Sequence, residues 1–138
     1  MLRILKIGGN VLVDPQALDQ TLSLFASYES PAILVHGGGR EASDLLKKMG
    51  HEAKMVNGRR ITDAATLEVV TMVYAGLINK QLVAQLQAKN CNALGVSGAD
   101  GNLIQAHKRV VKEIDYGFAG DIDAINTAGF KSLLEGGF

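Results

Sequence analysis

The sequence is poor in several residue types, and each shortage excludes a class of protein. Its 138 residues include one cysteine, two prolines and no tryptophan. The lone Cys91 cannot form a disulfide within the chain and is typical of a reducing compartment, so we expect a cytoplasmic protein. The 14 basic and 14 acidic residues leave no net charge and no basic run. Nucleic acid is therefore not expected as a partner, because neutralising phosphates requires an excess of Lys and Arg.

Long apolar runs and metal-ligand clusters are missing as well. The apolar stretch at residues 1–13 is interrupted by Lys6 and by Gly8-Gly9-Asn10, which leaves it too short for a signal peptide or a membrane span. No group of cysteines and histidines has the spacing of a metal site. The Gly-Lys pair of the common NTPase phosphate loop is also absent. We therefore expect no membrane anchor and no metal site built from this chain.

Glycine, in contrast, is abundant, and its 16 residues cluster behind apolar runs. Residues 2–7 form such a run before Gly8-Gly9, and residues 32–35 form another before His36 and Gly37-Gly38-Gly39. Strand-like and helix-like segments alternate along the chain, which predicts a mostly parallel sheet with helices on both faces. The expected fold class is therefore α/β, a three-layer αβα sandwich with a mostly parallel central sheet.

Hydrophobic periodicity and capping residues place the other elements. Helices are expected at residues 15–28, 42–49, 63–89 and 125–134, a hairpin at 54–61, a third core strand at 92–96, short strands at 103–106 and 110–112, and a second hairpin at 115–122.

Two glycine turns and one lysine form the candidate site. Both turns follow predicted parallel strands and so lie at the carboxyl edge of the sheet, where open α/β sheets bind ligands. The amides of Gly38 and Gly39 would add to the positive end of the helix that follows them and favour an anion. Burying Lys6 among apolar neighbours is costly unless it meets a negative charge, so the three features together indicate a pocket for phosphoryl transfer. The alternatives are a tight turn that binds nothing and a solvated lysine.

Other polar residues are harder to interpret from sequence. Arg59 and Arg60 are adjacent, so in an extended segment at most one can face the pocket, where it would suit a carboxylate; an exposed arginine pair is the alternative. His36 at a strand end is more typical of a packed residue than of a base. Lys80 is most simply a surface charge, and Asn79 lowers helix propensity for no reason visible in the sequence.

Six blocks of sequence, taken in order, resemble a known family. Their order and approximate spacing are similar to those of the N-acetylglutamate kinases of the amino-acid kinase family, over nearly the whole chain. The resemblance implies a phosphotransferase that uses ATP and Mg²⁺ to convert the side-chain carboxylate of an N-acylated glutamate to an acyl phosphate, in arginine biosynthesis. The blocks are KIGGN at 6–10, VHGGG at 35–39, NGRRIT at 57–62, AGLINK at 75–80, SGADG at 97–101 and DYGFAG at 115–120.

The resemblance also assigns roles to single residues. Lys6 matches the lysine that stabilises the transferring phosphoryl group, with Gly9 of the phosphate-binding Gly8-Gly9 turn and Gly38 supplying amides beside it. Gly38 and Gly39 match the turn that contacts the acylated amino acid, and Arg60 matches the arginine that holds its α-carboxylate. A carboxylate nucleophile is already ionised at neutral pH, so no general base is needed.

Departures from the family pattern leave part of the function open. Asn10, Ala99 and Ala119 replace residues more usual at those positions, which leaves the identity of the N-acyl group undecided. In the family a second half binds the nucleotide, and residues 1–138 do not include that half. We therefore expect residues 1–138 to be the N-terminal amino-acid-binding domain, inactive alone, of an enzyme that forms a homo-oligomer, a dimer or a hexamer. The alternatives are a non-catalytic amino-acid-binding module or fragment, and another carboxylate or carbamate kinase of the same fold.

Overall fold

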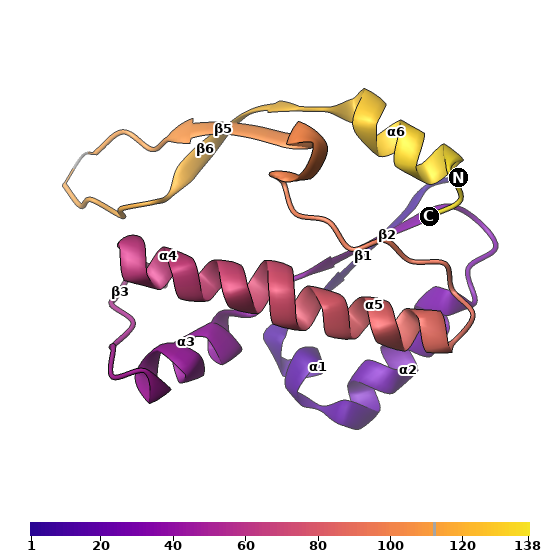
Figure 1. Ribbon diagram of the computed structural model, residues 1–138, viewed down its shortest axis with the longest axis horizontal. Coiled ribbons are helices and arrows are strands. Elements are labelled where there is room, and N and C mark those ends of the chain that lie inside the picture. The colour runs from indigo at the N-terminus through magenta and orange to yellow at the C-terminus, as the bar shows by residue number, and fades with distance from the viewer. Residues whose placement is uncertain (112) are drawn as a thin grey trace.

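Two parallel strands lie at the centre of the fold. β1 (Arg3–Ile7) and β2 (Ala32–His36) pair along their full length. The computed structural model describes residues 1–111 and 113–138, and it places this sheet between α6 (Thr127–Glu135) on one side and α2 (Pro15–Ala26) on the other (Figure 1). The predicted α/β class is therefore confirmed. In the part of the chain that is described, no helix has both the length and the apolar content to cross a membrane.

Local sequence signals explain where α2 and the first hairpin begin. The Asp14 carboxylate accepts two backbone amides of the first turn of α2, each at 3.0 Å, and Pro15 occupies the first helical position. The Asn57-Gly58 pair has positive φ at both residues, 51° and 73°, as a type I′ turn requires. It connects β3 (Met55–Val56) to β4 (Arg59–Arg60), so both predictions are confirmed.

The long helix predicted at residues 63–89 is continuous but is not α-helical throughout. α4 (Ala64–Thr71) leads into a π-helical segment, η1 (Met72–Ile78), and then into α5 (Asn79–Ala88). Because a π-helical turn closes its hydrogen bonds one residue later than an α-helical turn, it accommodates an extra residue in the buried row. That row advances in steps of four with a single step of five across η1, through Val69, Val73, Ile78, Leu82 and Leu86.

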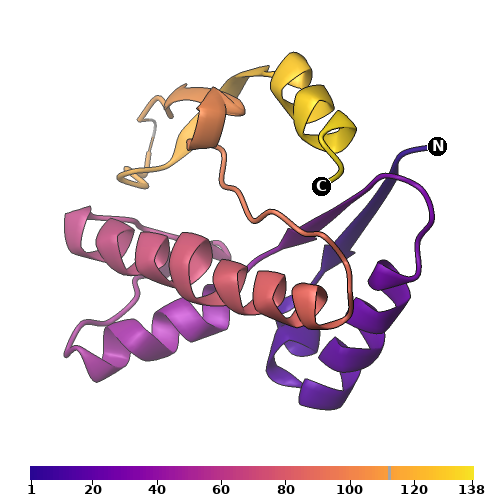
Figure 2. The same cartoon turned by 45° about the vertical axis from the view of Figure 1, so that its right-hand side comes forward.

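One face of the β1–β2 sheet packs against helices and forms the hydrophobic core with them. α2, α3 (Gly39–Lys48) and the α4–α5 helix pack with the face that carries Leu5 and Ile7, and Figure 2 shows these helices below the two strands. Ile4 and Lys6 alternate with the core residues along β1, point to the opposite face, and are exposed. The buried core side chains are Ile7, Leu22, Phe25, Ala42, Leu46, Val69, Val73, Ile78, Leu82 and Leu86.

A second hairpin lies across the top of the molecule. β5 (Ile104–Lys108) and β6 (Gly120–Ile125) pair antiparallel and lead into α6. The connection between them returns to the start of α4, where Thr62 and Gly117 form a parallel bridge. The Phe118 amide donates to the Thr62 carbonyl at 2.7 Å. This contact joins the second hairpin to the segment that directly follows β4.

Several predicted elements were wrong in extent or type. Residues 92–96 are not a strand: with β2 they line a cleft of about 770 Å³, and within the described ranges they take part in no strand ladder. A strand needs a neighbouring backbone as well as an apolar run. The second hairpin uses residues 104–108 and 120–125 instead of 115–122, after a short 3₁₀ turn, η2 (Asp100–Asn102). Of the strand expected at 110–112, Lys112 lies outside the described residues.

Candidate functional site

The two glycine turns lie side by side at the carboxyl edge of the sheet. Ile7 and His36, the last residues of β1 and β2, are ladder partners, so both turns begin at the same edge. Gly8 caps α1 (Gly9–Val13), a helix where only a turn was expected, and its carbonyl accepts the amides of the first helical turn at 3.1 and 3.3 Å. Gly38 caps α3 in the same way, accepting an amide at 2.9 Å. Two helix N-termini, each with amides that lack intrahelical acceptors, therefore meet here.

Gly38 is held close to the long helix. A side chain on Gly38 would meet Ile78 Cδ1 at 2.5 Å and the Tyr74 ring at 2.9 Å, whereas Gly37 has open space around it. Both contacting residues belong to the π-helical segment η1. The glycine at position 38 is thus required by packing.

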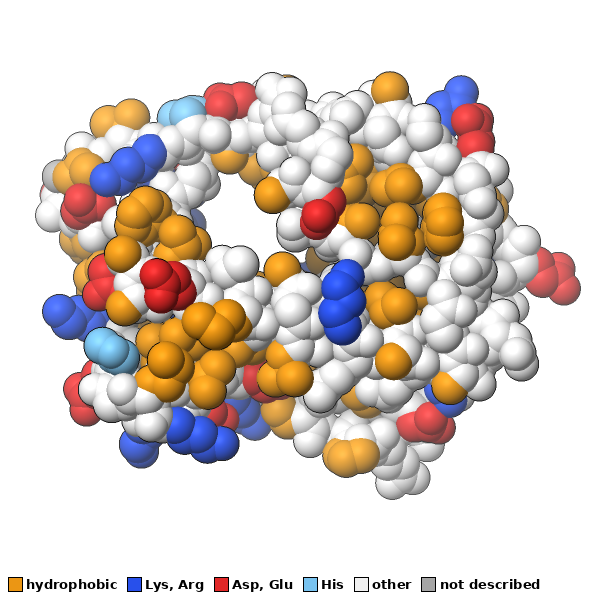
Figure 3. Space-filling view, in the orientation of Figure 1, with side chains coloured by type: hydrophobic (Ala, Val, Ile, Leu, Met, Phe, Trp, Pro, Cys, Tyr) orange, Lys and Arg blue, Asp and Glu red, His pale blue; other side chains and the backbone are white. Residues whose placement is uncertain are grey.

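Lys6 lies next to the turns but is not buried. It precedes Ile7 in β1, pairs with Val35, and is exposed on the sheet face that points away from the helical core. Strand alternation turns its ammonium to the open face, so Lys6 is not buried among the apolar neighbours that precede and follow it, and the cost of burying it does not arise. Figure 3 shows the molecule open between the β5–β6 hairpin and the α4–α5 helix.

Arg60 reaches the second glycine turn from β4. Its Nη2 donates to the Gly39 carbonyl at 2.8 Å and to Ser43 Oγ at 2.7 Å. Among the described residues, the buried Nε of Arg60 has no hydrogen-bond partner. Arg59 is exposed, so only one of the two arginines faces the turn, as the alternation along a strand predicts. The structure thus brings Arg60 to Gly39 and leaves one of its buried donors unpaired among the described residues.

Sequence reasoning missed a polar connection between the long helix and this edge. His36 Nδ1 lies 2.8 Å from the Gly37 carbonyl, and Asn79 Nδ2 lies 3.3 Å from His36 Nε2. Lys80 is exposed, as its interpretation as a surface charge predicts, and its Nζ donates to the Gly95 carbonyl at 2.9 Å. The signal available in the sequence was a poor helix former, Asn79, inside a predicted helix. The structure shows that this residue is buried, with only 7% of it exposed.

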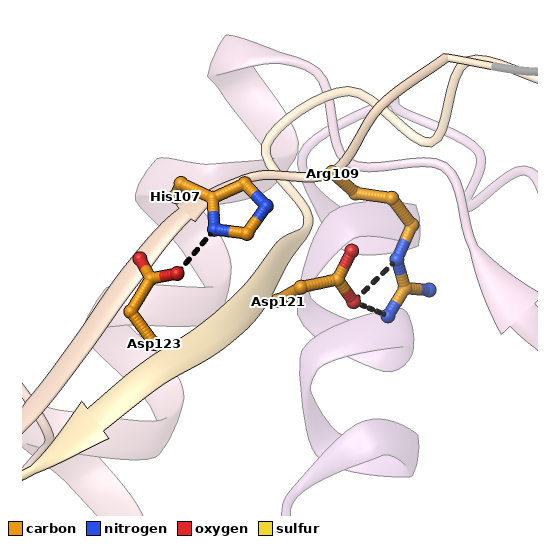
Figure 4. A network of polar contacts seen from close by, with 4 residues as sticks. All are labelled: His107, Arg109, Asp121 and Asp123. Carbon is orange, nitrogen blue, oxygen red and sulfur yellow. Dashed lines mark hydrogen bonds and ion pairs between the residues drawn. The ribbon is translucent and has the colours of Figure 1, made fainter.

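A few other charged groups are held by local hydrogen bonds. The Ser97 amide and hydroxyl both donate to Asp100, at 2.6 and 2.7 Å, and hold the pKa of that carboxyl below its ordinary value. On the β5–β6 hairpin the Arg109 guanidinium hydrogen-bonds to Asp121 and lowers the pKa of its carboxyl. Figure 4 shows this pair beside the contact between His107 and Asp123. Within residues 1–111 and 113–138 no three His, Cys, Asp or Glu side chains gather as a metal site.

These features define an α/β protein with two helix-capping glycine turns side by side at the carboxyl edge of its parallel strands. Lys6 precedes the end of β1 beside these turns, and Arg60 hydrogen-bonds to the second of them. The chain belongs to the amino acid kinase family, whose model matches residues 1–138.

Individual relatives agree with this assignment. The chain is 55% identical to an acetylglutamate kinase from Phocaeicola vulgatus over 133 aligned residues. These residues cover 96% of this chain and 51% of the relative. This chain is 45% identical over 141 residues to an acetylglutamate kinase from Methanopyrus kandleri, with 99% and 54% covered. The chain thus spans about half the length of the curated relatives it matches.

A solved structure has the same fold. N-acetylglutamate synthase from Neisseria gonorrhoeae, complexed with coenzyme A and N-acetyl-glutamate, superposes with a TM-score of 0.75 at 24% identity, over 99% of this chain and 31% of that one. At this level of identity the likeness concerns the fold alone.

Proposed function

We propose that this chain is the amino-acid-binding part of an acetylglutamate kinase, an enzyme that uses ATP to phosphorylate the side-chain carboxylate of N-acetylglutamate or a close analogue. The observation that carries the proposal is the placement of Arg60 against the Gly39 carbonyl with a buried, unpaired Nε among the described residues. An unpaired buried donor is costly, and a carboxylate is the partner that arginine binds best. The identity with acetylglutamate kinases over nearly the whole chain supports the same substrate.

The proposed roles follow from charge and position. Arg60 holds the α-carboxylate of the substrate, and the amides of Gly38 and Gly39 contact the rest of the amino acid. Lys6, with the amides of Gly8-Gly9 and Gly38, stabilises the negative charge of the transferring phosphoryl group. Because the acceptor carboxylate needs no deprotonation at neutral pH, catalysis consists of positioning and electrostatic stabilisation.

The nucleotide is assigned to a part of the protein beyond these residues. We propose a C-terminal nucleotide-binding domain, so that residues 1–138 bind the amino acid and do not turn over alone. No described cluster of side chains would hold a metal, and Mg²⁺ in such enzymes is bound largely through substrate phosphates. We therefore assign no residue of this chain to Mg²⁺. A homo-oligomeric enzyme, a dimer or a hexamer, stays a prediction.

Two pairs of variants in the complete enzyme test the site. Arg60→Ala should raise the KM for N-acetylglutamate, whereas the exposed neighbour Arg59→Ala should not. Lys6→Ala should lower kcat about a hundredfold or more, as loss of a transition-state donor does, whereas the exposed Lys48→Ala should leave kcat unchanged. Steady-state kinetics with both substrates measure the four variants. An unchanged KM in Arg60→Ala or wild-type turnover in Lys6→Ala would remove that residue from the site.

A further inference from the structure

The buried contact between Asn79 and His36 lies directly behind the second glycine turn. The two residues are 43 positions apart in the sequence and join the first turn of α5 to the end of β2. Asn79 is buried, and it directly follows the π-helical segment that packs on Gly38. A polar residue at a buried helical position needs hydrogen-bond partners, and His36 Nε2 is the partner of the Asn79 amide nitrogen.

The two hydrogen-bond partners of the His36 ring determine which of its nitrogens carries the proton. The Gly37 carbonyl can only accept, so His36 Nδ1, at 2.8 Å, carries the hydrogen that it donates. In the neutral ring Nε2 is then an acceptor, and it requires a donor, which the Asn79 amide nitrogen supplies. Asn79 thus selects the tautomer in which His36 holds the Gly37 carbonyl.

The orientation of the Gly37 carbonyl sets the direction of the next amide. The carbonyl of Gly37 and the N–H of Gly38 belong to one planar trans peptide and point in opposite directions. When His36 holds the carbonyl, the Gly38 N–H points away from the ring. This N–H is one of the donors that the proposed function assigns to the phosphoryl group.

The space around Asn79 leaves it little freedom to adopt another arrangement. A side chain on Gly95 would meet Asn79 Oδ1 at 2.0 Å and Val83 Cγ2 at 2.7 Å. Next to Asn79, Lys80 Nζ bonds to the Gly95 carbonyl from the same turn of α5. The Asn79 amide therefore lies between His36, which its Nδ2 contacts, and the Gly95 backbone, against which its buried Oδ1 packs without a hydrogen-bond partner among the described residues.

We propose that Asn79 is a positioning residue that, through the His36 tautomer, orients the Gly37–Gly38 peptide and so the Gly38 amide for phosphoryl transfer. The effect of Asn79 on the His36 tautomer is the geometric part of this proposal. Its effect on phosphoryl transfer is the catalytic part, which rests on the proposed function. Asn79→Leu has a similar volume but cannot donate to Nε2, so it separates hydrogen bonding from packing. Gln85→Ala, on the exposed side of α5, is the matched control.

Kinetics of the complete enzyme test the catalytic part. In Asn79→Leu we expect kcat to fall by up to about a hundredfold, the size of effect that a small misplacement of a catalytic group produces, with a smaller change in the KM for N-acetylglutamate. Rates are normalised to folded protein by thermal melting, and Gln85→Ala should match the wild type. Wild-type kcat in Asn79→Leu would overturn the proposal.

Nitrogen NMR of ¹⁵N-histidine-labelled protein tests the geometric part without any activity. The wild-type His36 ring should carry its proton on Nδ1, with the signal assigned by its loss in His36→Gln, and Asn79→Leu should shift that proton toward Nε2. A wild-type ring protonated on Nε2, or a tautomer unchanged in Asn79→Leu, would overturn the proposal. An enzyme that phosphorylates no acylglutamate but shows the expected ring signals would refute the proposed function and support the positioning of the peptide by Asn79.

Discussion

At the scale of single residues, the neighbouring glycines of the second turn have different surroundings. Gly38 is buried against Ile78 and the Tyr74 ring, and Gly37 faces open space. Neither has a φ in the left-handed region that would require glycine for backbone reasons. Packing alone therefore distinguishes the two positions.

Gly38→Ala should lower the free energy of unfolding by about 1–3 kcal/mol, the usual cost of overpacking a core. The added methyl must displace Ile78, itself only 6% exposed and surrounded by core residues. Gly37→Ala should change stability little, because its methyl meets nothing within 4 Å. Denaturant unfolding of both variants measures the difference, and equal losses would contradict the packing argument.

At the scale of elements, the start of α4 depends on one carboxylate. Asp63 accepts the Thr66 amide at 2.8 Å and caps the helix. This backbone hydrogen bond, followed by one with the Thr66 side chain, holds the pKa of Asp63 below its ordinary value of 3.8. The cap therefore favours the ionised carboxyl in the folded state.

Acid should weaken this cap. Because the folded-state pKa of Asp63 lies below 3.8, its contribution to stability is complete above that pH and is lost as pH falls through the depressed pKa. The stability difference between wild type and Asp63→Asn, which keeps a capping oxygen without a charge, should shrink from pH 6 toward pH 2. Unfolding midpoints across that range measure it. Two curves that stay parallel would contradict the prediction.

The bridge between Thr62 and Gly117 gives a second test at this scale. Gly117 has φ +69°, and a side chain on it would meet the Thr62 carbonyl at 2.1 Å. Gly117→Ala should cost the strain of a left-handed alanine, about 1–2 kcal/mol, and should also open the bridge. Since Thr62 closely follows Arg60, we expect the KM for N-acetylglutamate to rise as well.

Gly101→Ala is the control for Gly117→Ala. Gly101 has φ +56° with nothing within 4 Å, so it should suffer the left-handed strain alone and keep a wild-type KM. Denaturant unfolding and steady-state kinetics of both variants compare them. If both variants raised the KM equally, or neither did, the bridge would not position Arg60.

At the scale of the whole molecule, the proposed division of labour between two domains can be measured directly. Calorimetry on the 138-residue chain should detect binding of N-acetylglutamate and none of ATP. Turnover by this chain alone would contradict the proposed nucleotide domain. A complete protein that binds the amino acid but phosphorylates nothing would favour a non-catalytic module. Turnover of carbamate, aspartate or free glutamate in preference to N-acylglutamates would favour another kinase of this fold.

Local signals made part of this architecture predictable, and distant contacts decided the rest. Asp14-Pro15 and Asn57-Gly58 determine the start of α2 and the first turn by their own chemistry, so the sequence predicts both. Residues 92–96 have the composition of a strand, but a strand also requires a neighbouring backbone. The contact between His36 and Asn79 spans 43 positions and directly follows a π-helical segment, which a regular 3.6-residue period does not reveal.

The π-helical segment η1 holds one more residue than an α-helical segment would, while the residues on either side of it still face the core. Each residue rotates an α-helix by about 100°, so a deletion at Ala84 would swing Leu86 out of the core. Across η1 the buried row already steps by five instead of four. Losing Gly76 there would restore an unbroken row of fours and keep Asn79 directed at His36. The π-helical segment therefore lets the long helix hold one residue more than a row of fours would, while Leu82 and Leu86 stay in the core.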